Sequence, residues 1–378
     1  MGVLICASVE EAAVAALVDG GPRRDFLELA AATGARVVYR DGGGRKGGWR
    51  GRLAGPHVRH AWKVAKTAGN GDVIFADGEH VGIPVALFLR LRRRRARVVM
   101  LGHFVSKPWK RALLAMASRL GVAGSLLVHS KRQFESATAV IGHRWTVELV
   151  PYQVDTAYWT RPGDRGAVVL AVGAESRDYD TLGHAVRGLG ADVRIAAGSH
   201  WARKAAVVAE GDACVTWITE ALPFAPLRDE YRQAACVVVP LRDVPNQSGV
   251  TTILEAMSLA LPVVVTATGG QLEVVRGPLV TGAGIDERST AERGPGAFGA
   301  GVTDGSTGFY VPPADPPALQ RAISMLLDDR ELAERLGRAG RDAALRHFSV
   351  EGYVARLAGA IREQQRRVEG PAPRGVRA

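Results

Sequence analysis

Short runs of apolar, mostly β-branched residues alternate with longer helical patterns along the whole chain. The runs are continuous, with little alternation of apolar and polar positions, which is typical of parallel strands covered on both faces. In the first half the predicted strands are Val3–Ala7, Arg36–Tyr39, Asp72–Ala76, Arg97–Leu101, Ser125–His129 and Thr146–Val150. In the second half they are Ala167–Val172, Asp192–Ala197, Ala213–Trp217, Cys236–Pro240, Pro262–Thr266 and Gly308–Val311.

Helical segments fall between most of these strands, and one apolar helical stripe is formed by Leu319, Ala322, Ile323, Leu326 and Leu327. Alternation of strands and helices predicts an α/β fold with doubly wound parallel sheets. The strands are too many for one ordinary sheet, so we expect two Rossmann-like domains. Ligands of such domains bind at the carboxyl ends of the strands, and we expect the two domains to face an interdomain cleft.

Proline and glycine mark a linker between the two halves. We expect a first domain over residues 1–155, a second over 156–348, a C-terminal helix over 349–366 that crosses back to the first domain, and a flexible tail over 367–378. The stretch from 277 to 306 is rich in glycine and charge and lacks apolar periodicity, and it is predicted to be a long loop.

Composition narrows the class of protein. The 378 residues, 47% of them hydrophobic, suffice for two cores. The three cysteines, Cys6, Cys214 and Cys236, are scattered and indicate no disulfide framework or zinc site. The first residues lack a signal-peptide pattern, and no apolar run is long enough to span a bilayer. A cytoplasmic protein is expected.

The net charge of +11 is densest from Arg90 to Arg97 and continues at Lys107, Lys110 and Arg111. Three interpretations compete: a solvated helix end, attraction of region 90–111 to an anionic membrane, and nucleic-acid binding. Nucleic acid is the least favoured, because the arginines are not interleaved with aromatic residues that could stack on bases.

Candidate chemistry is concentrated between residues 245 and 266, where a polar turn runs into an apolar helix followed by a β-branched strand. The free N–H groups near Gly249, Val250 and Thr251 at the helix start would bind an anion such as a diphosphate. Glu255, about one turn further on, could accept hydrogen bonds from sugar or ribose hydroxyls. A buried strand–turn–helix of any α/β protein would show a similar pattern.

Several motifs together resemble the family-four retaining glycosyltransferases of GT-B architecture, over nearly the whole chain. The matching positions are Glu255, Pro262–Thr266, Gly269, Gly270 and Glu273, then the run Asp304–Pro313, and the loop Val172–Leu182. The resemblance implies a nucleotide-sugar-binding second domain and an acceptor-side first domain.

Site residues follow from the resemblance position by position. Arg177 stands where the family has its diphosphate-binding Lys or Arg, and arginine recognises phosphate in a bidentate way. His103 stands at a strand end where the family has a histidine that reaches the donor sugar. The predicted donor-binding residues are Arg177, Ser248, Gly249, Val250, Thr251 and Glu255. The residues predicted to form an acceptor or phosphate loop are Gly20, Gly21, Asp77 and Glu79. Gly20 and Gly21 precede a helix that is expected to begin at Pro22.

Two positions depart from the family pattern. Gln247 replaces the glutamate that touches the donor sugar, and an amide can still donate and accept hydrogen bonds. Ala174 replaces an arginine that follows the glycine of the first loop in the family, so one phosphate contact is lost. Arg177, His103 and Gln247 are the residues to which the resemblance assigns catalysis.

The resemblance implies a retaining, metal-independent hexosyltransferase that needs no cofactor. The expected donor is a UDP-sugar, with a GDP-sugar as the alternative, and the expected acceptor is a small molecule, such as an intermediate of natural-product biosynthesis. A lipid or cell-wall acceptor, a nucleotide-sugar epimerase, a phosphorylase and a basic binding protein without catalysis remain alternatives. The sequence leaves the oligomeric state open.

Overall fold

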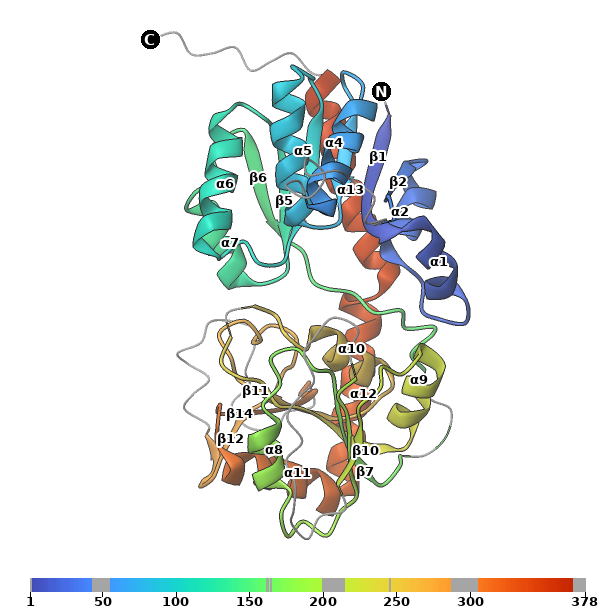
Figure 1. Cartoon of the computed structure of the whole chain (residues 1–378). Coiled ribbons are helices and arrows are strands. Elements are labelled where there is room, and N and C mark those ends of the chain that lie inside the picture. The colour runs from blue at the N-terminus through green and yellow to red at the C-terminus, as the bar shows by residue number, and fades with distance from the viewer. Residues whose placement is uncertain are drawn as a thin grey trace. The chain divides into compact units, whose positions relative to one another are not determined.

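The computed structural model describes residues 2–42, 55–160, 163, 165–198, 215–244, 246–286 and 305–369 (Figure 1). The chain divides into two compact units. Unit 1 consists of Met1–Asp19, Arg23–Pro151 and Glu351–Ala378, and unit 2 of Gly20–Pro22 and Tyr152–Val350. Each unit is a parallel sheet between layers of helices, as the continuous apolar runs predict.

Unit 1 has a six-stranded sheet of order β2-β1-β3-β4-β5-β6 in which all neighbours pair in parallel. Its strands are β1 (Val3–Glu10), β2 (Arg36–Arg40), β3 (Val73–Ala76), β4 (Arg97–Gly102), β5 (Gly124–Val128) and β6 (Trp145–Leu149). Strands β3 and β5 are buried at every residue, which accounts for the apolar character of β3 and of all of β5 except Ser125.

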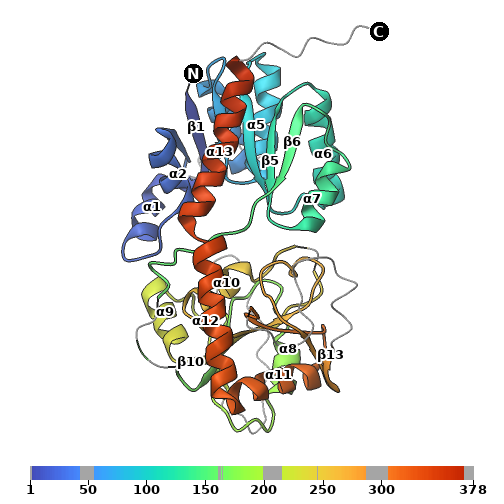
Figure 2. The same ribbon diagram turned by 180° about the vertical axis from the view of Figure 1, so that it is seen from behind.

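The helices of unit 1 cover both faces of this sheet (Figures 1 and 2). They are α1 (Glu11–Val18), α2 (Asp25–Thr33), α4 (Pro56–Thr67), α5 (Glu79–Leu91), α6 (Pro108–Arg119), α7 (Lys131–Thr138) and α13 (Val350–Glu369). Helix α13 comes from the far end of the sequence. It is fixed to the sheet through Gln364, whose amide donates to Ser125 Oγ at 2.8 Å and accepts from Arg97 at 3.0 Å.

Unit 2 has an eight-stranded sheet of order β13-β12-β14-β11-β10-β7-β8-β9. Its strands are β7 (Val168–Val172), β8 (Val193–Ala196), β9 (Val215–Ile218), β10 (Ala234–Val239), β11 (Val263–Thr266), β12 (Leu279–Thr281), β13 (Gly284–Asp286) and β14 (Gly308–Val311). All neighbours are parallel except β12 and β13, which form an antiparallel hairpin at one edge.

The helices of unit 2 are α8 (Tyr179–Ala185), α9 (Phe224–Arg232), α10 (Val250–Ser258), α11 (Pro316–Asp328) and α12 (Arg330–His347). Two hydrophobic clusters fill the space between helices and sheet, one containing Ile253 and Leu254 of α10 and the other Leu319 and Ile323 of α11. The predicted apolar stripe of α11 therefore faces the core.

All the predicted strands form, within a few residues at their ends, and the two doubly wound α/β sheets are confirmed. Three local predictions are wrong. The helix expected from Pro22 begins at Asp25, because the backbone at Arg24 is extended. The predicted loop 277–306 contains the β12–β13 hairpin, and its residues 287–304 lie outside the described part. Helix α13 continues into the predicted tail as far as Glu369, and residues 370–378 are likewise not described.

Each sheet has a point where the strand order reverses, and this is where ligands of doubly wound folds bind. In unit 1 it lies between β1 and β3, and in unit 2 between β7 and β10. The predicted site residues Asp77, Arg177 and Gln247 follow β3, β7 and β10, respectively, so the topology brings them to these points.

Candidate functional site

Helix α10 of unit 2 begins with amide groups that have no partner. Its first residue follows Gly249, which has a φ of 82° and therefore a backbone shape that favours glycine. The N–H of Val250 donates to Gln247 O at 3.4 Å and that of Ile253 to Gly249 O at 3.0 Å. Within the described residues, the N–H groups of Thr251 and Thr252 have no acceptor. They form a site for an anion at the positive end of the helix.

Arg177 lies beside this helix start and is only 7% exposed. Its Nε donates to Val172 O at 3.0 Å, and its two terminal nitrogens donate to Glu175 O at 2.9 Å and to Thr252 Oγ1 at 3.2 Å. Three of its five N–H groups are thus used to fix the guanidinium, and two remain for a ligand. Burial lowers the pKa of Arg177, but an arginine stays charged in proteins.

Two glycines make room for the guanidinium. A Cβ on Gly173, where φ is 100°, would lie 2.5 Å from a terminal nitrogen of Arg177. A Cβ on Gly249 would lie 3.4 Å from the other terminal nitrogen and 2.7 Å from Val239 Cγ1. The predicted diphosphate residues of unit 2, Arg177 and the turn before α10, are therefore brought together around two glycine loops.

Glu255 lies on the same helix, half-buried, and is held by a residue that the sequence did not indicate. Tyr231, at the end of α9, is fully buried and donates from its hydroxyl to Glu255 Oε2 at 2.8 Å. Burial raises the pKa of Glu255 to about 7, against the opposing effects of Tyr231 and Arg177. Thr252, the acceptor for Arg177, lies three residues before Glu255 and hence on the same face of α10. Helical periodicity could have indicated Thr252, whereas Tyr231 is 24 positions from Glu255 and no local pattern links them.

Gln247 and the loop after β11 meet on the other side of the helix start. The Gln247 amide donates to Glu273 Oε2 at 3.3 Å, and its buried Oε1 has no partner among the described residues. The buried Ser248 accepts at its carbonyl from Gln271 at 2.9 Å. Glu273, which matches the family motif, and Gln247, which departs from it, are therefore neighbours. Asp304 of the last motif lies outside the described residues.

At the corresponding point of unit 1, Asp77 is bound by Ser8. The Ser8 N–H donates to Asp77 Oδ2 at 2.6 Å, and the Ser8 hydroxyl donates to Oδ1. The same hydroxyl lies 3.0 Å from His80 Nε2. Burial raises the pKa of Asp77, although the hydrogen bonds from Ser8 oppose this. Asp77 thus lies at the edge of the sheet where it was expected, in a cluster with a serine and a histidine.

Glu79 is engaged within unit 1. It is 2% exposed, forms an ion pair with Lys110 of α6 and accepts from the His103 N–H at 2.9 Å. Burial would raise the pKa of Glu79, but Lys110 and the His103 amide hold it below its ordinary value. Both carboxylate oxygens are occupied, so Glu79 fixes the loop that carries His103. Nε2 of the His103 ring lies 3.2 Å from the main-chain carbonyl oxygen of Asp77, so the ring is beside Asp77.

The predicted glycine loop at Gly20 and Gly21 is grouped with unit 2, and it has a simpler environment. Gly20 has a φ of 64°, which requires a flexible residue, but a Cβ there would meet no atom within 4 Å. Gly21 follows it in the same turn. The close approach seen at Gly173 and Gly249 does not occur at Gly20.

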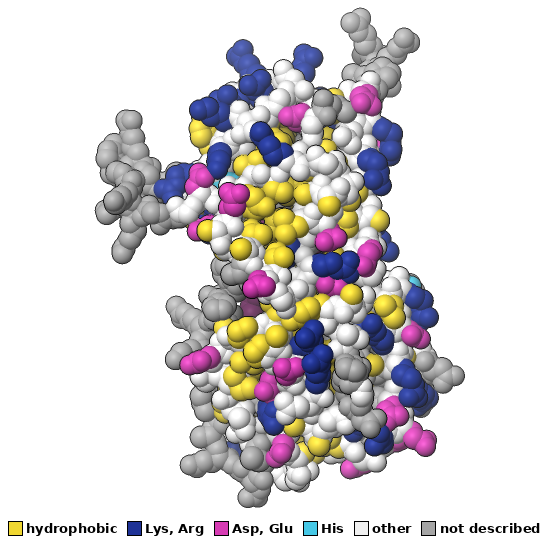
Figure 3. Space-filling model, turned by 90° about the vertical axis from the view of Figure 1, so that its right-hand side faces the viewer, with side chains coloured by type: hydrophobic (Ala, Val, Ile, Leu, Met, Phe, Trp, Pro, Cys, Tyr) yellow, Lys and Arg dark blue, Asp and Glu magenta, His cyan; other side chains and the backbone are white. Residues whose placement is uncertain are grey.

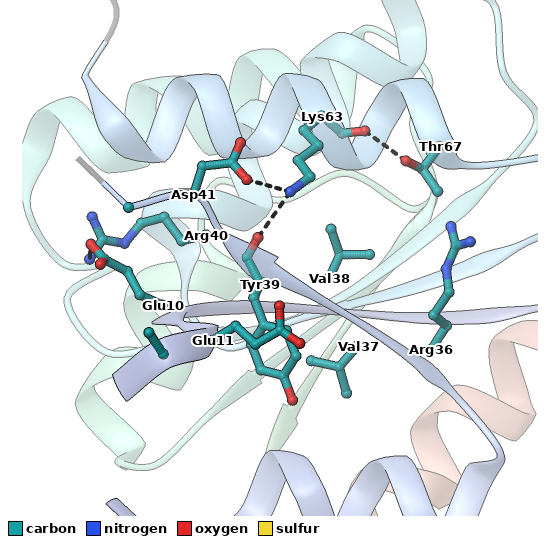
Figure 4. Close-up of a pocket in the computed structure, with 12 residues that line it drawn as sticks. Glu10, Glu11, Arg36, Val37, Val38, Tyr39, Arg40, Asp41, Lys63 and Thr67 are labelled. Atoms are coloured by element: carbon teal, nitrogen blue, oxygen red, sulfur yellow. Dashed lines mark hydrogen bonds and ion pairs between the residues drawn. The ribbon is translucent and has the colours of Figure 1, made fainter. Parts of the chain in front are cut away.

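A cavity of about 760 Å³ lies at the edge of the unit 1 sheet next to β2 (Figure 4). Four of its charged side chains form two ion pairs, Lys63 with Asp41 at 2.5 Å and Arg40 with Glu10 at 2.9 Å. Because these charges are already compensated, the cavity is a poorer candidate for an anionic ligand than the start of α10.

Known proteins share this fold and part of this sequence. Residues 166–293 match the family described as "Glycosyl transferases group 1". No curated protein sequence matches the chain. Among solved structures, HepE of Anabaena in complex with UDP and glucose has 16% identity and a TM-score of 0.60, covering 96% of this chain and 99% of that one. Sucrose-phosphate synthase of Thermosynechococcus elongatus has 17% identity and a TM-score of 0.64, covering 96% and 98%. A glycosyltransferase of Rickettsia africae has 10% identity and a TM-score of 0.59, also covering 96% and 98%.

These matches confirm the GT-B fold and the resemblance to glycosyltransferases that the motifs indicated. The matched segment contains Arg177, the turn before α10, Glu255 and Glu273, which are the residues that unit 2 brings together.

Proposed function

We propose that this group 1 glycosyltransferase transfers a sugar from a nucleotide diphosphate to a hydroxyl, or another nucleophile, of a small-molecule acceptor in the biosynthesis of a natural product, with retention at the anomeric carbon. The observation that carries the proposal is the buried Arg177 guanidinium beside the partnerless amides of Thr251 and Thr252. A cation and two amide dipoles at one point suit a diphosphate better than any neutral ligand.

The chemical role of this arrangement is to stabilise the leaving group. When the glycosidic bond breaks, its electron pair stays on the diphosphate, and negative charge develops there. Arg177 and the start of α10 are already oriented for that charge, because three hydrogen bonds and two glycine loops hold them. These groups supply the positive charge that a metal ion would otherwise provide, and we propose that the transfer is metal-independent.

For retention, the acceptor oxygen attacks from the face that the diphosphate leaves. The new bond forms from that oxygen to the anomeric carbon, and the departing phosphate oxygen takes the acceptor proton. No residue of the protein is needed as a base in this scheme. The acceptor is proposed to bind unit 1 at the edge that carries Asp77 and His103, and His103 to contact the donor sugar.

Glu255 and Gln247 are proposed to hold the rest of the donor. Glu255 would accept from the ribose hydroxyls, with Tyr231 fixing one of its two oxygens. Gln247 would contact the sugar hydroxyls together with Glu273, which its amide already reaches. A UDP-sugar is the proposed donor, and the presence of UDP in the HepE structure supports that choice.

Ligand-dependent thermal unfolding tests the proposal. A nucleotide that binds the folded state raises its melting temperature, so UDP should raise it more than GDP, CMP or inorganic phosphate. The same shift should be lost in Arg177→Ala. If no nucleoside diphosphate shifts the wild-type melting temperature, the proposed function is wrong. Incubation of a UDP-sugar without acceptor then separates a transferase from an epimerase, since only an epimerase converts the sugar unaided.

A further inference from the structure

Charge is distributed unevenly between one segment of unit 1 and the rest of the chain. Residues 80–134 contain twelve Lys and Arg residues and no Asp or Glu. The whole chain has a net charge of +11, so everything outside this segment carries a net charge of −1. On the face shown in Figure 3, by contrast, acidic and basic side chains are interspersed. The basic character of the protein therefore belongs to one region that runs from α5 to the start of α7.

Much of this charge is exposed at the end of α5. The side chains of Arg90, Arg93 and Arg95 are exposed, and no carboxylate in the described part of the chain pairs with them. Arg90 donates from Nε to Leu120 O at 2.7 Å, which joins the end of α5 to the end of α6. Arg90, the first of these arginines, thus lies next to the C-terminal end of α6.

Helix α6 has apolar residues on two faces. One face is buried against unit 1 and includes Leu114 and Ala117. On the outward face, Trp109 is 59% exposed, Met116 42% and Leu120 43%. Their spacing of seven and four residues places them in one stripe along the helix. Leu91, at the end of α5, is 71% exposed. A contiguous apolar stripe that faces solvent marks an interaction site rather than an ordinary surface.

We propose that this surface binds an anionic lipid bilayer. The α6 face, defined as Trp109, Met116, Leu120 and Leu91 with the arginines from Arg90 to Arg95, would lie in the plane of the lipid headgroups. Its apolar stripe would enter the interface while the arginines contact lipid phosphates. Trp109 belongs to the residue type most enriched at such interfaces.

Charge complementarity selects the bilayer over other occupants. An apolar groove of a protein partner would cover the apolar stripe but would leave the exposed arginines Arg90, Arg93 and Arg95 without a counter-charge. A nucleic acid would satisfy the cations, but the aliphatic Met116, Leu120 and Leu91 offer no surface for base stacking. An anionic bilayer offers both an apolar interior and a negative surface. None of the described helices is long and apolar enough to cross a bilayer, so the contact would be peripheral.

Vesicle co-sedimentation of the full chain tests the apolar part. Wild-type protein should sediment with phosphatidylcholine vesicles that contain about 30% phosphatidylglycerol, and stay in solution with phosphatidylcholine alone. The double variant Met116→Glu, Leu120→Glu should lose at least roughly tenfold in affinity for the anionic vesicles, because it removes the apolar stripe and adds negative charge that the lipids repel. Leu345→Glu is the matched control, since Leu345 is 46% exposed on α12 of unit 2, and it should bind as wild type.

A second pair of variants tests the charge. Arg93→Glu with Arg95→Glu should weaken vesicle binding roughly tenfold and reduce its dependence on salt, whereas Arg338→Glu on α12 should change neither. The proposal is overturned if wild-type protein stays in the supernatant with anionic vesicles at about 0.1 M salt, or if the α6 variants bind like wild type. It is also overturned if the wild type is a dimer that the α6 variants dissociate and no vesicle binding is found, since the face then docks a second copy. UDP should still raise the melting temperature of both variants of the α6 face, the Met116 and Leu120 pair and the Arg93 and Arg95 pair. The membrane test is therefore independent of the donor site.

Discussion

Units 1 and 2 share one architecture but equip its ligand-binding edge in different ways. In unit 2 the edge presents main-chain amides and a buried guanidinium, held by glycines at 173 and 249. In unit 1 the edge presents a carboxylate, Asp77, tied to Ser8 and surrounded by histidines. The shared fold therefore does not fix the chemistry of this edge: the loop residues give unit 2 hydrogen-bond donors with a positive charge and give unit 1 a carboxylate.

Two buried groups, one in each unit, should also respond to acid with opposite signs. Burial raises the pKa of Glu255 in unit 2 to about 7 and lowers that of His129 in unit 1 to about 3. A raised carboxyl pKa means that the folded state holds the proton more tightly, and a lowered histidine pKa means that it holds the proton less tightly. Falling pH therefore favours folded unit 2 through Glu255 and disfavours folded unit 1 through His129.

The largest expected effect comes from Arg177→Ala. Loss of the guanidinium should lower turnover by a factor of about 10² to 10³, the usual cost of removing a group that stabilises developing charge. Turnover of a UDP-sugar with a competent acceptor is the measurement. Because three hydrogen bonds of Arg177 are internal, circular dichroism must show that the variant is folded, and Arg177→Lys serves as the charge-conserving control. A folded Arg177→Ala enzyme with wild-type turnover would contradict the proposed diphosphate contact.

The next effect compares two glycines with positive φ, Gly249 before α10 and Gly20 in the predicted glycine loop. Gly249→Ala should lower the free energy of unfolding by about 2 to 4 kcal/mol, since it combines a positive φ with a Cβ placed 2.7 Å from Val239. Gly20→Ala should cost only about 1 kcal/mol, from backbone strain alone. Urea unfolding gives both values, and UDP binding should be weakened by the first substitution only. Equal effects of the two substitutions would remove the contrast between the glycine loops.

The third test concerns His129 in unit 1, which is 7% exposed and bonded through Nδ1 to Val150 O at 2.9 Å. The pKa of His129 in the unfolded chain is near 6.5, whereas burial lowers it to about 3 in the folded chain. The free energy of unfolding should therefore decrease as pH falls from 6.5 toward 3, by about 1.4 kcal/mol per pH unit. His129→Asn does not titrate and should show a shallower loss. Hydrogen exchange of the unit 1 amides between pH 4 and pH 7 measures the difference, and identical slopes in the two proteins would refute it.

The smallest effect is that of Glu255→Gln on unit 2. In the wild type the folded carboxyl keeps its proton up to about pH 7, whereas the unfolded one loses it near pH 4.5. The stability of unit 2 should therefore fall as pH rises from 4.5 to 7, and the glutamine variant should lack this contribution. Hydrogen exchange of the unit 2 amides is the readout. A variant that keeps the full wild-type slope would show that Glu255 does not titrate in this range.

The two sheets could be predicted because most of their strands are buried on both faces. Such strands have continuous apolar runs in the sequence. The sequence did not predict β12 and β13, because each has only three residues, too few to show a pattern, and the edge strand β13 has no buried residue. The amide groups of the proposed diphosphate site could be located from the sequence because Gly249, Val250 and Thr251 are adjacent in the chain. Tyr231 and the pair of Glu79 with Lys110 were not, because their contacts depend on how helices pack and leave no local signal.

The attachment of α13 to unit 1 has a consequence for synthesis on the ribosome. Gln364 is fully buried and completes the hydrogen bonding of Ser125 and Arg97, yet it is translated after the whole of unit 2. The nascent N-terminal part therefore emerges without its last covering helix and must wait, with part of its sheet exposed, until translation is nearly finished. Unit 2, which is nearly continuous in sequence, is by contrast complete before α13 is translated.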